Sequence, residues 1–174
     1  MKTFAETDRL ILREITLDDD QGMFELDSDP EVHWYLGNNP IKSIDDSRDI
    51  IKSVQQQYAE NGIGRWAVIE KSTGSFTGWA GLKLIRETVN GYTDFHDLGY
   101  RLIRKYWGKG YATEASIAAR DYGFGVMNLD VIYGMTSVDN LGSQNVLQKV
   151  GMKYMNDFDR FGIMHKWYEV RSQK

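Results

Sequence analysis

One stretch, residues 97–126, constrains the fold more than any other, because it predicts a strand, a glycine turn and a helix in direct succession. Apolar side chains fall on every second position over residues 98–102, which is the period of a β-strand. Gly108 and Gly110 follow, and glycine accepts backbone conformations that other residues avoid. Beyond them, small and apolar residues recur at helical spacing, so a helix is expected to begin within a residue or two of Gly110.

A glycine turn that opens into a helix is an anion site, because the first N–H groups of the helix are unpaired and its dipole is positive there. Phosphate is the natural ligand of such a site. A Walker loop is excluded, since the chain has no Gly-x4-Gly-Lys-Ser/Thr string. A dinucleotide fingerprint fits poorly, because Thr113 stands in place of its third glycine and Asp130 precedes the next strand instead of ending it. A tight turn between the strand and the helix that binds no ligand is a further alternative.

The segment after this helix, residues 131–152, predicts a second strand and a second helix. Asn140 stands where an N-cap is expected, and Gly151 stands just past the end. Between them the apolar residues lie at i, i+3 and i+4 spacing. The segment therefore predicts a strand followed by an amphipathic helix.

Two motifs together resemble the GNAT superfamily of acyl-CoA N-acyltransferases. They are residues 107–115 (WGKGYATEA) and residues 140–152 (NLGSQNVLQKVGM). Residues 7–13 (TDRLILR) and 99–102 (GYRL) resemble most of all the branch that contains the ribosomal-protein N-terminal acetyltransferases. The resemblance covers nearly the whole chain.

The resemblance implies a mixed α/β (α+β) GNAT fold, with a central, mostly antiparallel sheet of about six to seven strands. This sheet would be splayed in the middle and covered by helices on both faces. A length of 174 residues agrees with a single domain spanning residues 1–174. Period and turn signals predict strands at residues 9–14, 65–70, 76–86, 95–103, 131–136, 153–157 and 163–170, and helices near residues 16–27, 43–61, 111–126 and 140–150.

Composition narrows the functional classes. A net charge of −4 argues against a general nucleic-acid binder. The sequence contains neither an apolar run of membrane-spanning length nor a signal-peptide core, so no membrane partner and a cytoplasmic location are expected. The chain has no cysteine, which excludes thiolate metal ligands and an acyl-cysteine intermediate, and no metal is expected.

The cosubstrate implied by the resemblance is acetyl-CoA. Its pyrophosphate would bind the backbone N–H groups of the glycine loop, and its pantetheine arm would lie between the splayed strands like an added strand. The residues implied in the loop are Trp107, Gly108, Lys109, Gly110, Tyr111, Ala112 and Thr113. Backbone groups near Tyr100 to Ile103, among them those of Leu102 and Ile103, would pair with the pantetheine. The side chain of Asn140 would bond to a pantetheine amide, although capping of the helix alone also explains this residue. Lys105 and Lys109 are either phosphate ligands or solvated surface residues.

Direct attack by an amine needs a base that removes its proton. Asp97 is the first candidate, because it lies where its strand begins to border the gap, and His96 is the second. An equally simple interpretation makes Asp97 a polar residue at a strand end.

The departing thiolate needs a hydrogen-bond donor. Many GNAT enzymes place a tyrosine on the helix after the splayed strand, but the matching position here is Leu147, which cannot donate. Ser143 is the substitute candidate, with helix packing as its alternative role.

The acceptor is a primary amine, and the branch resemblance favours the N-terminal α-amine of a protein. A small-molecule amine such as a polyamine or an aminoglycoside is the alternative acceptor. A non-catalytic acyl-CoA-binding module is the alternative function, in which Leu147 reflects lost chemistry. A homodimer is compatible with each of these functions.

Overall fold

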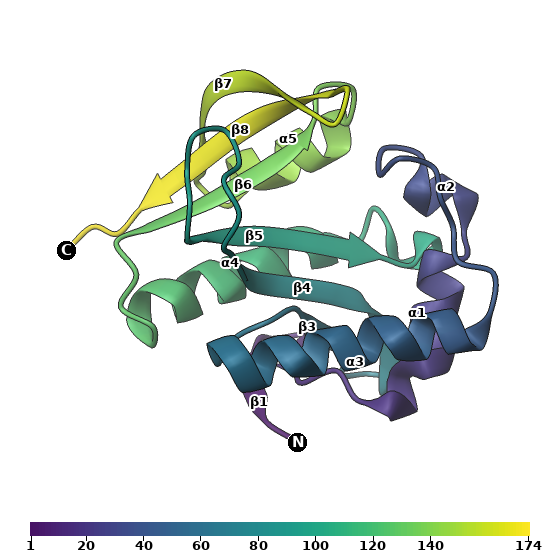
Figure 1. The fold of residues 1–174 in the computed structure, drawn as a ribbon. Coiled ribbons are helices and arrows are strands. Elements are labelled where there is room, and N and C mark those ends of the chain that lie inside the picture. Colours follow the sequence, from purple (N-terminus) through teal and green to yellow (C-terminus); the bar gives the residue numbers. More distant parts are fainter.

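The computed structural model describes residues 1–174 and is built around one eight-stranded sheet (Figure 1). The strands are β1 (Thr3–Glu6), β2 (Leu10–Arg13), β3 (Trp66–Glu70), β4 (Ser75–Ile85), β5 (Phe95–Leu102), β6 (Val131–Ser137), β7 (Lys153–Arg160) and β8 (Ile163–Arg171). The helices are α1 (Asp20–Asp27), α2 (Pro30–His33), α3 (Ile44–Asn61), α4 (Tyr111–Gly125) and α5 (Leu141–Lys149), with short 3₁₀ turns at Leu17–Asp19 and Arg104–Tyr106.

The sheet order is β1-β2-β3-β4-β5-β6-β8-β7, and every neighbouring pair is antiparallel except β5 and β6. The mixed α/β architecture predicted from the sequence, with a mostly antiparallel central sheet, is confirmed. The sheet has eight strands, where about six to seven were predicted, and the strand that the sequence did not reveal is β1. This strand has only four residues, and its two inner residues, Phe4 and Ala5, are both half-buried. It therefore lacks the alternation that reveals a strand in a sequence.

Helix ends follow the predicted capping chemistry. Ser43 and Asp46 form a reciprocal capping box at the start of α3, and Gly62 ends that helix with a φ of +69°. Asn140 caps α5 by accepting a hydrogen bond from the N–H of Ser143 at 3.1 Å. Local hydrogen bonds and backbone conformation therefore set these helix boundaries.

Helices lie on both faces of the sheet, as Figure 1 shows with α3 in front of the strands and α4 behind them. A Cβ atom on Gly123 of α4 would lie 2.7 Å from Ile132 and 2.8 Å from Leu82, so this helix packs closely on the face that carries those two side chains. The other face meets α1, because Arg101 of β5 forms an ion pair with Asp27 at the end of that helix. We call these two sides the α4 face and the α1 face.

The sheet opens between β5 and β6. These parallel strands pair at a single register position, Asp97 opposite Tyr133, and diverge beyond it. A cluster of six buried residues packs near this closed end; its members are Ile85, Val89, Phe95, Tyr133, Phe158 and Trp167. The main core of 27 buried residues is separate and includes Tyr168, so Trp167 and Tyr168 face different sides of β8, as the sequence predicts. The predicted splay in the middle of the sheet is therefore present.

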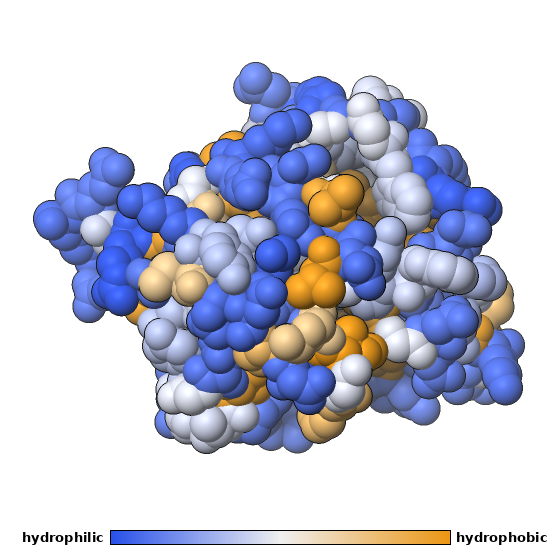
Figure 2. Space-filling model, turned by 90° about the horizontal axis from the view of Figure 1, so that it is seen from above, coloured by the Kyte–Doolittle hydropathy of each residue, from blue (hydrophilic) through white to orange (hydrophobic).

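The surface is mixed in character. Figure 2 shows small groups of hydrophobic residues separated by hydrophilic ones on the face seen from above. None of the helices is both long enough and apolar enough to cross a bilayer.

Candidate functional site

The glycine turn before α4 has the backbone geometry that its sequence predicts. Gly108 and Gly110 have φ values of +73° and +79°, a region that favours glycine over other residues. The first N–H of α4 with a partner in its own turn belongs to Glu114, which donates to the carbonyl of Gly110 at 3.0 Å. The N–H groups of residues 111–113 therefore precede the hydrogen-bond ladder of the helix, where the dipole is positive. The turn thus has the form of an anion site.

The negative charge of Glu114, which lies beside this anion site, is compensated by residues of the N-terminal segment. Glu114 accepts hydrogen bonds from the hydroxyl of Thr7 at 2.6 Å and from Nε of Arg9 at 2.7 Å. Burial acts to raise the pKa of Glu114, but the bonds from Thr7 and Arg9 outweigh it and bring that pKa below its ordinary value. Nη1 of Arg9 also donates to the carbonyl of Lys109 at 2.9 Å. Arg9 therefore braces the loop as well as compensating the carboxylate, a role that its sequence motif did not reveal.

The two lysines near the turn, Lys105 and Lys109, interact with other side chains of the protein. Nζ of Lys105 lies 2.9 Å from Glu25, and Nζ of Lys109 lies 5.1 Å from the centre of the Tyr106 ring. Tyr111 is buried, and its hydroxyl donates to the carboxylate of Glu70. That hydrogen bond lowers the pKa of Glu70, with a further contribution from Thr73. Backbone amides, more than lysine side chains, therefore define the anion site.

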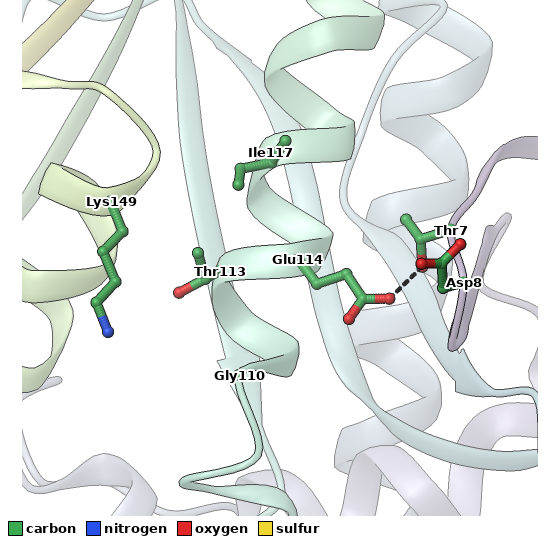
Figure 3. A pocket seen from close by; sticks show the side chains of 7 residues that line it. All are labelled: Thr7, Asp8, Gly110, Thr113, Glu114, Ile117 and Lys149. Atoms are coloured by element: carbon green, nitrogen blue, oxygen red, sulfur yellow. Dashed lines mark hydrogen bonds between the residues drawn. The ribbon is translucent and has the colours of Figure 1, made fainter.

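An open cavity of about 600 Å³ lies beside the turn (Figure 3). It is lined by Thr7, Asp8, Gly110, Thr113, Glu114, Ile117 and Lys149. In Figure 3, Lys149 extends from α5 on the side of Thr113. On the side away from Lys149, Glu114 accepts a hydrogen bond from Thr7. Lys149 supplies a cation that sequence reasoning missed, since a lysine in the last turn of a helix gives no distinctive signal.

The gap between β5 and β6 exposes backbone groups of β5. The N–H of Ile103 donates to the carbonyl of Thr77 at 2.9 Å, in continuation of the β4–β5 ladder. Successive residues of a strand direct their N–H groups to opposite sides. The N–H groups of Tyr100 and Leu102 therefore point away from β4 and into the gap.

The backbone of Ile103 is already engaged within the protein. Its N–H is taken by Thr77, and its carbonyl accepts from the N–H of Tyr106 at 2.9 Å. The N–H of Leu102 borders the gap, and the carbonyl of Leu102 accepts a hydrogen bond from the indole Nε1 of Trp107 at 2.8 Å. The amides that border the gap are thus those of Tyr100 and Leu102.

The far side of the gap ends at the start of α5. The amide of Gln144 donates to the carbonyls of Ser137 and Val138, which fixes the turn between β6 and the helix. Asn140 uses its side-chain oxygen for the cap, and Ser143 is half-buried in the first turn. Leu147, where the family tyrosine is expected, is 2% exposed and packs within the main core. That position therefore serves packing in this chain.

Asp97 is buried at the closed end of the gap and pairs with Arg65. The same guanidinium donates through Nη1 to the carbonyls of Gly81, at 2.6 Å, and Asp97, at 2.7 Å. Only Oδ2 of the carboxylate is engaged, since Oδ1 is buried with no hydrogen-bond partner. Asp97 thus combines a structural ion pair with one free oxygen, and nothing in its sequence context predicted Arg65 as its partner.

His96, the second base candidate, points away from Asp97. Adjacent residues of a strand face opposite sides, so His96 lies on the α4 face and Asp97 on the α1 face. Burial lowers the pKa of His96, which keeps its ring neutral at physiological pH. No group of three or more His, Asp or Glu side chains is placed to hold a metal ion.

Comparison with known proteins gives one consistent result. Residues 9–153 match the family model of the acetyltransferase (GNAT) domain. The N-acetyltransferase p20 of Bacillus licheniformis, described as uncharacterized, is 33% identical over 167 residues, covering 96% of this chain and 88% of that protein.

Solved structures share the fold. A GNAT-family acetyltransferase from Bacillus anthracis superimposes with a TM-score of 0.79 at 23% identity, covering 95% of this chain and 96% of that one. RimL, a ribosomal L7/L12 α-N-protein acetyltransferase in complex with coenzyme A, gives a TM-score of 0.80 at 14% identity, with 98% of both chains covered.

Proposed function

Because the chain belongs to the GNAT acetyltransferase family and is an N-acetyltransferase, we propose that it transfers an acetyl group directly from acetyl-CoA to the N-terminal α-amine of a protein. The observation that carries the proposal is the adjacency of two features. An amide-lined helix N-terminus lies next to a pair of parted strands. Together they fit a diphosphate joined to a thin arm that needs strand-like hydrogen bonds.

The residues present fit coenzyme A along its length. Amides of residues 108–113 would hold the pyrophosphate at the turn. The N–H groups of Tyr100 and Leu102 would pair with the pantetheine, and one of them would polarise the thioester carbonyl. Lys149, in the cavity beside the turn, would meet a phosphate of the nucleotide part. The bound group supplies an activated acetyl thioester.

The chain's own residues would then manage the proton. Asp97 lies on the α1 face at the closed end of the gap, and its free oxygen Oδ1 is the proposed acceptor of the amine proton. Ser143, at the start of α5, lies on the other side of the gap. With no cysteine in the chain, transfer without an acyl-cysteine intermediate is the proposed route.

An amine acceptor would approach on the α1 face. Trp34, Tyr35 and Leu36 are exposed hydrophobic residues directly after α2, a helix that contacts α1. They would contact the residues that follow a protein N-terminus. Support for this acceptor comes from the RimL likeness in fold and from the sequence motifs of that branch.

A small-molecule amine is the second candidate acceptor. The net charge of −4 favours a cationic acceptor such as a polyamine, since like-charged acceptors would be repelled. The same surface would then need carboxylates in place of an apolar wall.

The test measures release of the coenzyme A thiol from acetyl-CoA with three acceptors: peptides with free N-termini, spermidine and an aminoglycoside. We expect peptide-dependent turnover, abolished when the peptide N-terminus is blocked. Turnover with spermidine alone would transfer the proposal to small amines. Thermal stabilisation by coenzyme A without turnover on any amine would support the non-catalytic alternative, whereas absence of stabilisation would contradict the site itself.

A further inference from the structure

Tyr100 is placed to take the role that Leu147 cannot fill. Tyr100 lies on β5, three residues beyond the single pairing position of β5 and β6, and therefore borders the open part of the gap. Its side chain shares the α4 face with those of Leu98 and Leu102, because the three residues are separated by even spacings. Both α4 and α5 lie on this side of the sheet (Figure 1). The phenol thus reaches the side of the gap where α5 begins.

Ser143, in the first turn of α5, is the side chain that acts on the hydroxyl of Tyr100. Burial raises the pKa of Tyr100, and the hydroxyl of Ser143 acts in the opposite direction. The phenol therefore keeps its proton at neutral pH. Tyr100 on β5 and Ser143 on α5 lie on opposite sides of the gap. Ser143 in turn is fixed, since its N–H donates to the capping oxygen of Asn140.

We propose that Tyr100 is a catalytic residue whose hydroxyl donates a hydrogen bond to the departing sulfur of coenzyme A, with Ser143 as the positioning residue that orients it. The inference rests on the proposed function and assigns a group that its mechanism otherwise lacks. It moves the donor from the helix, where the family tyrosine is expected, to the strand on the opposite side of the gap.

The step balances without a further reactant. The amine nitrogen bonds to the acetyl carbon, the carbon–sulfur bond breaks, and the sulfur keeps the electron pair of that bond. A thiol has an ordinary pKa of about 8.5, below that of a phenol near 10. Tyr100 therefore stabilises the thiolate by donating a hydrogen bond and retains its proton. The proton lost by the nitrogen passes to the base, and solvent protonates the thiolate.

The first test reads the thiol and needs no acceptor. The ultraviolet absorbance of the thiolate is followed while coenzyme A, bound to saturation, is titrated with base. We expect the thiol pKa to be lower on the wild-type protein than on Tyr100→Phe by about one unit, because a hydrogen bond to a charged group is lost. Tyr122→Phe, on α4 away from the gap, is the matched control and should titrate like the wild type. Equal thiol pKa values for wild type and Tyr100→Phe would overturn the proposal, even if the enzyme acetylates amines.

The second test reads turnover, with the amine that gives the fastest wild-type rate. Tyr100→Phe should lower kcat about a hundredfold while leaving the KM for acetyl-CoA and the thermal midpoint near wild type. Ser143→Ala should lower kcat less, since it removes only the orienting partner. A large loss in Ser143→Ala together with normal kcat in Tyr100→Phe would assign the donor to Ser143 instead. A wild-type protein that binds coenzyme A but turns over no amine would contradict the proposed function, and the thiol titration would still decide the placement of Tyr100.

Discussion

Asp97 and Tyr100 lie three residues apart on β5, and their side chains point to opposite faces of the sheet. Asp97 shares the α1 face with Arg65, while Tyr100 shares the α4 face with the start of α5. A base and a donor on opposite sides of one strand suit direct transfer, because the nitrogen arrives on one side of the acetyl carbon and the sulfur leaves on another. One strand therefore carries both halves of the proposed proton chemistry.

Replacing Gly110 should separate strain from binding. Gly110→Ala forces a side chain into a φ of +79° and should lower the free energy of unfolding by about 1 kcal/mol. It should also weaken coenzyme A binding about tenfold or more, since the amides of the turn shift. Gly62→Ala is the matched control, because Gly62 has a φ of +69° at the end of α3 and open space around its Cβ position. Calorimetry and urea unfolding should show equal stability losses but a binding loss only for Gly110→Ala; equal binding by both variants would contradict the phosphate site.

Removing the carboxylate of Asp97 should affect both stability and rate. Asp97→Asn leaves the guanidinium of Arg65 buried without its charge partner, so the free energy of unfolding should fall by about 3 kcal/mol. Asp49→Asn breaks an exposed ion pair with Lys52 and should cost less than about 1 kcal/mol. Urea unfolding checks both values. If Asp97 is the base, the folded variant should also lose the fall in kcat at low pH; an unchanged pH profile would leave Asp97 with its structural role only.

Lys149 should recognise the phosphate that distinguishes coenzyme A from dephospho-coenzyme A. Lys149→Gln removes the cation of the cavity beside Gly110 and should weaken coenzyme A binding about tenfold, equivalent to about 1.4 kcal/mol. Binding of dephospho-coenzyme A should change little, because that ligand lacks the 3′-phosphate. Lys153→Gln, at an exposed position of β7, serves as the control for net charge. Titration calorimetry with both ligands decides the matter, and equal losses for the two ligands would place the phosphate elsewhere.

Acid should destabilise the protein through Glu70 and Glu114. The pKa values of both carboxyls are lowered in the folded state, so their contribution is present above the unfolded value, about 4.3, and is lost as pH falls through the folded values. Tyr111→Phe removes a hydrogen bond to Glu70 and should lower the melting temperature at pH 7. The difference from wild type should narrow as the pH falls through the lowered folded pKa of Glu70, because protonation removes the charge that the hydrogen bond stabilises. Melting curves over this range test it, with Tyr154→Phe on exposed β7 as the control; a difference independent of pH would show that Glu70 does not titrate as described.

Local patterns predicted the elements that depend on local chemistry. The cap of α5 by Asn140 and the stop of α3 at Gly62 were readable because capping involves residues three or four positions apart. The positive φ values of Gly108 and Gly110 were readable for the same reason. The parted strands were predicted through the family resemblance, since no local pattern encodes a gap.

Contacts between distant residues could not be predicted in this way. Asp97 and Arg65 are separated by 32 positions, and no period in the sequence connects them. Tyr100 was predicted as a strand residue whose backbone pairs with the pantetheine, but no role was predicted for its side chain, because that role depends on how α5 lies across the gap. The bond from the N–H of Ile103 to Thr77 could not be predicted either, since the β4–β5 ladder continues one residue beyond the end of β5. Register, rather than residue type, decided that case.

Because β5 and β6 pair only at Asp97 and Tyr133, the sheet divides into two parts. The first part contains β1 to β5 and the second contains β6 to β8. The aromatic rings of Phe95, Tyr133 and Trp167 pack against one another where the two parts meet. A cosubstrate that binds like a strand between β5 and β6 would add hydrogen bonds between the two parts. Binding of the cosubstrate would then make the sheet more rigid. The part formed by β6 to β8 would gain the most rigidity, because it has only three strands of its own.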